Sequence, residues 1–235
     1  MILDCDLLIG RDITTGRRQS TAELRGRLEV AGIDGGAVTS LRALSFDPES
    51  GNHEAVAAAR DVGWMAVCGV DLRHPVDAES RMEAAAARGT RLVRFATTRQ
   101  GIPGTAPRLR LLTRRATAAG LTILVEGSTR TVGAAMMGLG ATVIFLDQHF
   151  YDAGEFILTA REEPGFHAST RLLGNPDAWE TIAEHAGAER LVFGARSGWF
   201  EEHSVLARLR SSGLDAAQRD LVTSGNLLRL NGGPR

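Results

Sequence analysis

The sequence contains no lysine, and all 27 of its basic side chains are arginine. A Schiff-base mechanism and a covalently held pyridoxal cofactor both need a lysine amine, so this absence excludes them. Cysteine is also scarce. Cys5 and Cys68 both lie in apolar, strand-like runs, which predicts buried free thiols and no disulfide. We expect no bound cofactor.

Long apolar runs and a strong net charge are missing as well. No run approaches the ~20 apolar residues that a membrane-spanning helix needs, and the sequence opens on a strand-like segment in place of a basic leader. The formal net charge of −1 provides no long-range field for nucleic acid or an anionic membrane. We therefore expect a cytoplasmic protein whose partner is a small molecule. A homodimer is compatible with this composition.

Short β-type runs alternate with longer helical patterns along the chain, which is the order expected of βα units around a parallel sheet. Helical patterns lie at Asp77–Arg88, Ala106–Ala119, Asp177–Ala186 and Glu201–Ser211. Eight strands are predicted, at Ile2–Leu8, Ala37–Leu41, Trp64–Val70, Arg91–Ala96, Leu121–Glu126, Thr142–Asp147, Gly165–Thr170 and Arg190–Gly194.

Eight strands with eight crossovers are typical of a (β/α)8 TIM barrel, and 235 residues suit one such domain. We therefore predict a single α/β domain over residues 1–235. Periodicity alone does not show that the sheet closes, so an open doubly wound sheet is the alternative.

The two ends of the chain carry recognisable segments. The opening, Asp4-Cys5-Asp6-Leu7-Leu8-Ile9-Gly10, resembles the Asp-x-His-x-His-x-Gly strand of the amidohydrolase superfamily, in its amidohydrolase-related and ACMSD-like branch. Near the other end, Arg190-Leu191-Val192-Phe193-Gly194-Ala195-Arg196 resembles the last strand of that family, Arg-Leu-x-Phe-Gly-Ser-Asp. Gly225-Asn226-Leu227-Leu228-Arg229-Leu230 is similar to its closing helix.

The resemblance implies a metal-dependent barrel enzyme, but the residues at the implied ligand positions differ. The two histidines of the first strand are Asp6 and Leu8, and the aspartate of the last strand is Arg196. Glu126 stands where the family places another histidine. Because leucine binds no metal and arginine repels a divalent cation, we expect no metal site of the usual kind.

In a barrel, residues at the carboxyl ends of the strands face the active site. These positions give a predicted catalytic set and a predicted substrate-binding set. The sixth predicted strand offers Asp147 or His149, depending on its register. The catalytic set is Asp6, Glu126, Asp147, His149 and Arg196, and the substrate-binding set is Arg94, Asp71 and Trp199.

The chemistry of these side chains favours a small anionic substrate. Arg196 and Arg94 could bind a carboxylate or phosphate or stabilise developing negative charge. Glu126 or Asp6 would then be the general acid or base, and His149 a proton shuttle, in hydrolase, lyase or isomerase chemistry without a metal. Two alternatives remain open: an inactive binding or scaffold protein whose charges are all paired, and a metal-dependent hydrolase or decarboxylase with non-standard ligands.

Overall fold

The computed structural model of the protein describes residues 1–233, so the end of the predicted domain at residue 235 lies outside the described residues. The strands form one nine-stranded sheet in the order β2-β1-β3-β4-β5-β6-β7-β8-β9. All neighbouring strands are parallel except β1 and β2. The strands are β1 (Leu3–Arg11), β2 (Arg18–Gln19), β3 (Gly35–Ser40), β4 (Met65–Val70), β5 (Leu92–Phe95), β6 (Thr122–Val125), β7 (Val143–Phe145), β8 (Phe166–Ser169) and β9 (Leu191–Val192).

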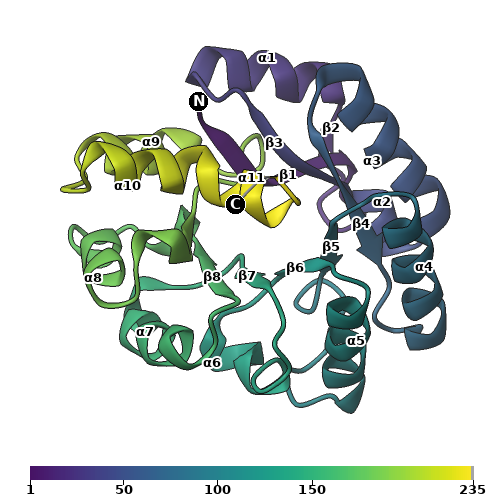
Figure 1. Cartoon of the computed structure of the whole chain (residues 1–235). Helices are drawn as coiled ribbons and strands as arrows, with labels where there is room; N and C mark the ends of the chain where they lie inside the picture. The colour runs from purple at the N-terminus through teal and green to yellow at the C-terminus, as the bar shows by residue number, and fades with distance from the viewer. Residues whose placement is uncertain (234–235) are drawn as a thin grey trace.

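Helices follow most strands and cover the convex side of the curled sheet (Figure 1). The α-helices are α1 (Thr21–Ala31), α2 (Leu41–Ser45), α3 (Pro48–Val62), α4 (Pro75–Ala87), α5 (Pro107–Ala118), α6 (Thr129–Val132), α7 (Ala153–Glu162), α8 (Ala178–His185), α9 (Glu202–Arg210), α10 (Ala216–Asp220) and α11 (Asn226–Leu230). Short turns of other helix types are η1 (Gly133–Ala135), η2 (Phe150–Asp152), η3 (Thr170–Leu172), η4 (Ala188–Arg190) and η5 (Leu221–Gly225). No helix within residues 1–233 combines the length and apolarity that crossing a membrane requires.

All eight predicted strands are present, and the α/β alternation is confirmed. The ninth strand, β2, was not predicted. It consists only of Arg18 and Gln19, which turn back antiparallel to the end of β1. Two polar residues carry no β-type pattern, so sequence reasoning had no signal for it. Cys5 and Cys68 are buried and unpaired, as expected.

The sheet curls until its first and last parallel strands approach each other. The backbone N–H of Cys5 in β1 donates to the carbonyl of Phe193, directly after β9, at 3.0 Å. The carboxylate of Asp4 accepts hydrogen bonds from the backbone N–H groups of Ala195 at 3.1 Å and Ser197 at 3.0 Å. The Ser197 hydroxyl adds a bond of 2.7 Å to the same carboxylate. Asp4 therefore joins the start of the sheet to the segment that follows its end.

An irregularity in β1 decides which of its side chains face inward. The register of β1 on β3 shifts between Asp4 and Leu7. Before the shift, Leu3 and Cys5 belong to the apolar cluster on the concave side; after it, Leu7 belongs to the layer under the helices. Strand side chains alternate strictly, so a shift of this kind changes which residues share a face. Asp6 thereby comes to the inner side.

Helix α11 covers the amino-terminal edge of the curled sheet, in the middle of the ring of helices in Figure 1. Its Leu227 is buried in the concave cluster with Leu3, Val192 and other inward strand residues. Asn226 anchors the helix, because its amide donates to the carbonyls of Ala188 at 3.0 Å and Leu191 at 2.7 Å. This end of the sheet is thus filled with apolar side chains, and the polar side chains collect at the opposite edge.

Candidate functional site

The carboxyl edge of the sheet, where the parallel strands end, carries a cluster of six charged side chains. Asp6 comes from β1 and Arg94 from β5, while the others follow the ends of β6 to β9. We call this the charge cluster: Asp6, Arg94, Glu126, Asp147, Arg171 and Arg196. Its three carboxylates and three guanidinium groups balance, so the cluster as a whole carries no net charge.

The deep part of the charge cluster is centred on Arg94, which is fully buried. Its Nη1 donates to Asp6 Oδ1 at 2.5 Å, and its Nη2 donates to Glu126 Oε1 at 3.0 Å. The second oxygen of Glu126 accepts the backbone N–H of Arg99 at 3.2 Å. Both carboxylates are therefore held by hydrogen bonds and by opposite charge, as burial of an ionised group requires.

The outer part of the charge cluster is centred on Asp147. Arg196 bridges the two parts, because its Nε donates to Asp6 Oδ2 at 2.6 Å and its Nη2 to Asp147 Oδ1 at 3.2 Å. Arg171 donates to the same Asp147 oxygen. The ring of Phe200 lies over both guanidinium groups, 4.8 Å from that of Arg171 and 5.7 Å from that of Arg196. Two cations thus share a single carboxylate oxygen under one aromatic ring.

Arg196 is held in an unusual backbone conformation. Its φ of 51° is the only positive φ of a non-glycine residue within the described chain. A residue other than glycine in this left-handed backbone conformation costs on the order of 1–3 kcal/mol, which the surrounding contacts must offset. The conformation occurs in the turn after β9 and is compensated by the two ion pairs that Arg196 makes. Backbone strain at a cluster of buried charges is typical of a functional site.

Charge–charge interactions favour the ionised forms of Asp6 and Arg196. Burial disfavours the Asp6 carboxylate, but Arg196 and Arg94 more than offset it and hold its pKa below the usual value. Burial also opposes the charge on Arg196, and the carboxylates of Asp6 and Asp147 raise its pKa. For Arg171, burial and the nearby Arg196 lower the pKa. Asp6 is therefore a poor proton acceptor, since both of its oxygens are occupied and its charge is stabilised.

The cluster does not suit a divalent cation. Asp6 stands at an implied ligand position, but both of its oxygens accept guanidinium hydrogen bonds. Leu8 packs in an apolar cluster with Leu41 and Leu44. Within residues 1–233, the only group of three acidic, histidine or cysteine side chains close enough to share a metal is Glu201, Glu202 and His203, none of which belongs to the charge cluster. Arg94 and Arg196 thus occupy both oxygens of the carboxylate that a cation at this position would need.

A pocket of about 350 Å³ adjoins the charge cluster. This volume is at the lower end of the range of about 300–1,000 Å³ typical of small-molecule sites. Glu126 and Asp147 line it, together with residues of the β5–α5 loop and of the segment that follows β6. The other lining residues supply hydroxyl and apolar groups: Thr97, Thr98, Ile102, Pro103, Gly104, Gly127, Ser128, Thr131 and Val132. A ligand in this pocket would contact Asp147 directly.

The structure brings together five of the eight predicted site residues: Asp6, Arg94, Glu126, Asp147 and Arg196. Of the two candidates after β7, Asp147 lies in the cluster. The ring of His149 instead stacks on Tyr151 at 4.6 Å, and its Nδ1 accepts the Tyr151 backbone N–H.

Asp71 and Trp199 also lie at the carboxyl edge, but neither has a hydrogen bond or ion pair to the cluster. Asp71 is buried and bound by the guanidinium of Arg73, its neighbour in the same loop, at 2.7 and 2.8 Å. The indole N–H of Trp199 donates to the carbonyl of Leu8 at 2.9 Å, and its ring packs with the apolar cluster around Leu8. Both side chains hold loops in place.

Sequence reasoning missed three charged residues of this edge. Arg171 belongs to the charge cluster, and the guanidinium of Arg99 pairs with Asp12 at 3.1 Å, joining the β5–α5 loop to the β1–β2 turn. Each of the three lies within a few residues after a strand, in the same kind of position as the predicted set. Their position after strand ends is the sequence feature that could have identified them.

Several solved structures have the same fold. The 5-carboxyvanillate decarboxylase from Sphingomonas paucimobilis is 13% identical with a TM-score of 0.71, over 99% of each chain. A Staphylococcus aureus protein described as an amidohydrolase is 8% identical with a TM-score of 0.74, over 98% of this chain and 99% of that one. The dihydroxybenzoic acid decarboxylase of a Polaromonas species, solved with manganese and an inhibitor, is 11% identical with a TM-score of 0.72, over 98% and 96%.

These likenesses confirm the predicted resemblance in fold to amidohydrolase-type enzymes. The sequence itself matches no family model. A search of curated proteins gives no match either.

Proposed function

We propose that this chain is an enzyme of amidohydrolase fold that acts on a small carboxylic acid at the carboxyl edge, using arginine and carboxylate side chains in place of a metal. The observation that carries the proposal is the outer part of the charge cluster, where two guanidinium groups converge on one oxygen of Asp147 beside a pocket. The decarboxylases of the same fold act, by their names, on aromatic carboxylic acids.

The proposal includes a closed barrel in one domain over residues 1–235. The hydrogen bond from Cys5 to Phe193 and the contacts of Asp4 with Ala195 and Ser197 support a seam between β1 and β9. A closed sheet surrounds the inner face on all sides, which holds the charge cluster at the mouth of the barrel.

The substrate binds by exchanging its own carboxylate for that of Asp147. The substrate carboxylate replaces Asp147 on Arg171 and Arg196, so one ion pair is substituted for another of the same kind. Arginine binds carboxylates through parallel N–H groups. Arg171 also has a buried Nε without a protein acceptor, and a buried donor of this kind is stabilised by a ligand that accepts its bond.

This exchange frees the carboxylate of Asp147 for a role in the reaction. Asp147 leaves its guanidinium partners, lies at the pocket wall, and can then transfer a proton to or from the substrate as the general acid or base. Arg196 and Arg171 stabilise negative charge that develops on the bound acid. Asp6 and Arg94 position Arg196, and Glu126 lines the pocket. This assignment covers hydrolase, lyase or isomerase chemistry.

One observation favours the alternative of binding without catalysis. Every carboxylate in the charge cluster already has a guanidinium partner. Such pairing also describes a cluster that only fills the mouth of a barrel. The two functions differ in turnover: a binding protein retains the acid unchanged, while the enzyme consumes it.

Isothermal titration of the full chain with 5-carboxyvanillate tests the exchange. Because Asp147 competes with the ligand for the two arginines, Asp147→Asn should bind the acid more tightly than the wild type. Arg171→Met should bind it roughly tenfold or more weakly, since hydrogen bonds to charged groups contribute about 1.5–3 kcal/mol. The dimethyl ester, which lacks the charge, should bind all three proteins weakly.

Equal affinity of the wild type, Asp147→Asn and Arg171→Met for the acid would overturn the proposed site. Incubating the acid with the wild type and following its ultraviolet spectrum separates the enzyme from the binding protein. If the wild type consumes the acid and Asp147→Asn does not, the result supports proton transfer by Asp147.

A further inference from the structure

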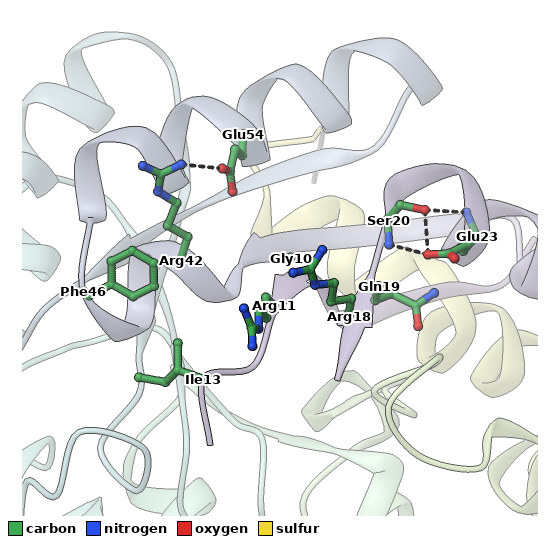
Figure 2. Close-up of a pocket in the computed structure, with 10 residues that line it drawn as sticks. All are labelled: Gly10, Arg11, Ile13, Arg18, Gln19, Ser20, Glu23, Arg42, Phe46 and Glu54. Carbon is green, nitrogen blue, oxygen red and sulfur yellow. Dashed lines mark hydrogen bonds and ion pairs between the residues drawn. The ribbon is translucent and has the colours of Figure 1, made fainter. Parts of the chain in front are cut away.

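A second pocket, of about 800 Å³, lies outside the charge cluster (Figure 2). It is placed where β1 ends at Gly10 and Arg11, next to β2 and the start of α1. On its other side are Arg42 and Phe46, from α2 and its end, and Glu54 of α3. None of its lining residues belongs to the charge cluster or to the pocket beside it. The residues that line this pocket therefore need a functional explanation of their own.

Two arginines are opposed in this pocket without a carboxylate between them. Arg11 and Arg18 are direct partners in the antiparallel register of β1 and β2. Side chains in such positions have Cβ atoms about 4.5–5.5 Å apart, and like charges there are destabilising. Within residues 1–233 neither arginine forms an ion pair, although the region supplies acidic side chains. Figure 2 shows both guanidinium groups in the space between Phe46 and Ser20.

The acidic residues that line the pocket are engaged elsewhere. Glu23 accepts the backbone N–H of Ser20 at 2.8 Å and its hydroxyl at 2.7 Å, as part of the cap of α1. Glu54 accepts Arg42 at 3.2 Å and the Ser40 hydroxyl at 2.8 Å. Arg42 also pairs with Asp47 at 2.7 Å. The lining holds three arginines and two glutamates, a net charge of +1, and Arg11 and Arg18 are the two of these arginines that have no ion pair within residues 1–233.

Apolar side chains form the wall beside these charges. Ile13 is 59% exposed and Phe46 is 61% exposed, and both line the pocket. Large apolar side chains beside an unpaired polar group are characteristic of small-molecule sites. The guanidinium of Arg42 lies 5.9 Å from the centre of the Phe46 ring. This contact positions the ring at one edge of the pocket.

We propose that this pocket binds a small molecule in which an oxyanion, a phosphate or a carboxylate, is attached to a planar apolar group. Arg11 and Arg18 hold the oxyanion between them and lose their mutual repulsion when it binds. Ile13 and Phe46 cover the apolar group. The site is separate from the proposed catalytic site, and its ligand need not be the substrate.

Isothermal titration of the full chain with phenyl phosphate, benzoate and inorganic phosphate tests the site. Phenyl phosphate should bind the wild type, and the double variant Arg11→Gln/Arg18→Gln should bind it at least tenfold more weakly. The matched control, Arg60→Gln/Arg114→Gln, removes the same charge from exposed helix positions without ion pairs and should keep the wild-type affinity. Arg171→Met, which alters only the charge cluster, should keep it too.

Comparing the probes assigns the ligand. Tighter binding of phenyl phosphate than of inorganic phosphate supports the apolar wall, and the ratio of phenyl phosphate to benzoate decides between a phosphate and a carboxylate. The proposal is overturned if phenyl phosphate and benzoate both fail to bind the wild type at millimolar concentration. It is equally overturned if the Arg11→Gln/Arg18→Gln variant binds as the wild type does, or if Arg171→Met alone abolishes binding.

Discussion

Arg94 illustrates, at the scale of a single residue, how the charge cluster is held together. It is fully buried and bound to Asp6 and Glu126, while its Nε has no acceptor. Removing one partner of a buried ion pair leaves an uncompensated charge and typically costs about 3–5 kcal/mol. Arg94 is thus a structural centre of the cluster, and the more accessible Arg171 is the better position for a binding test.

His167 makes a prediction about pH. It faces inward from β8, is 3% exposed, and its Nδ1 lies 2.8 Å from the Gly165 carbonyl. Burial lowers its pKa to about 4. Because an unfolded histidine has a pKa near 6.5, the unfolded chain binds the proton first. The neutral ring stabilises the fold above pH ~6.5, and this contribution falls by roughly 3 kcal/mol as the pH drops to 4.

Urea unfolding between pH 7 and pH 4 measures this effect. His167→Gln should be less pH-dependent than the wild type over this window, whereas the exposed control His185→Gln should behave as the wild type does. Parallel pH profiles of the wild type and His167→Gln would contradict the assignment.

At the residue scale, the sequence predicted the inner members of the charge cluster because their positions follow from strand ends. It could not choose between Asp147 and His149, since that choice depends on where β7 stops and how the chain turns after it. It also could not show that Asp6 is bound by two arginines. Those contacts join strands that are far apart in the sequence, such as β1 and β5, and their pairing is a property of the curled sheet.

At the scale of elements, strands and helices were more predictable than side-chain partners. The predicted helix Ala106–Ala119 differs by one residue at each end from α5, and Asp177–Ala186 differs similarly from α8. Apolar periodicity and the glycines that follow helices mark these boundaries locally. The shift in β1 was not predictable, because it depends on pairing with β3.

Helix α11 makes a prediction about stability. Leu227 is 1% exposed and fills the amino-terminal end of the concave cluster, while Leu228 on the same helix is 40% exposed. Leu227→Ala should lower the free energy of unfolding by about 2–5 kcal/mol, because it leaves a cavity among strand residues. Leu228→Ala should lower it by less than about 1 kcal/mol. Equal losses in urea unfolding of the two variants would contradict the role of α11 as a seal.

At the scale of the whole molecule, the two ends of the curled sheet have different roles. Apolar side chains and α11 fill the amino-terminal end of the concave side, and the charge cluster lies at the carboxyl edge beside a pocket. The β1–β2 turn contributes to two places: Asp12 pairs with Arg99 of the β5–α5 loop, and Ile13 lines the second pocket. The apolar packing around α11 and the proposed catalytic site thus lie at opposite edges of the sheet.

Metal content is the measurement that tests the central claim most directly. Elemental analysis of the protein, purified without chelator or added metal, should be compared with that of the Asp6→Asn/Glu126→Gln variant. Because both oxygens of Asp6 accept hydrogen bonds from arginine, we predict far less than one zinc or manganese per chain in both proteins. About one metal per chain in the wild type, lost in the variant, would contradict the account and assign the site to metal-dependent chemistry.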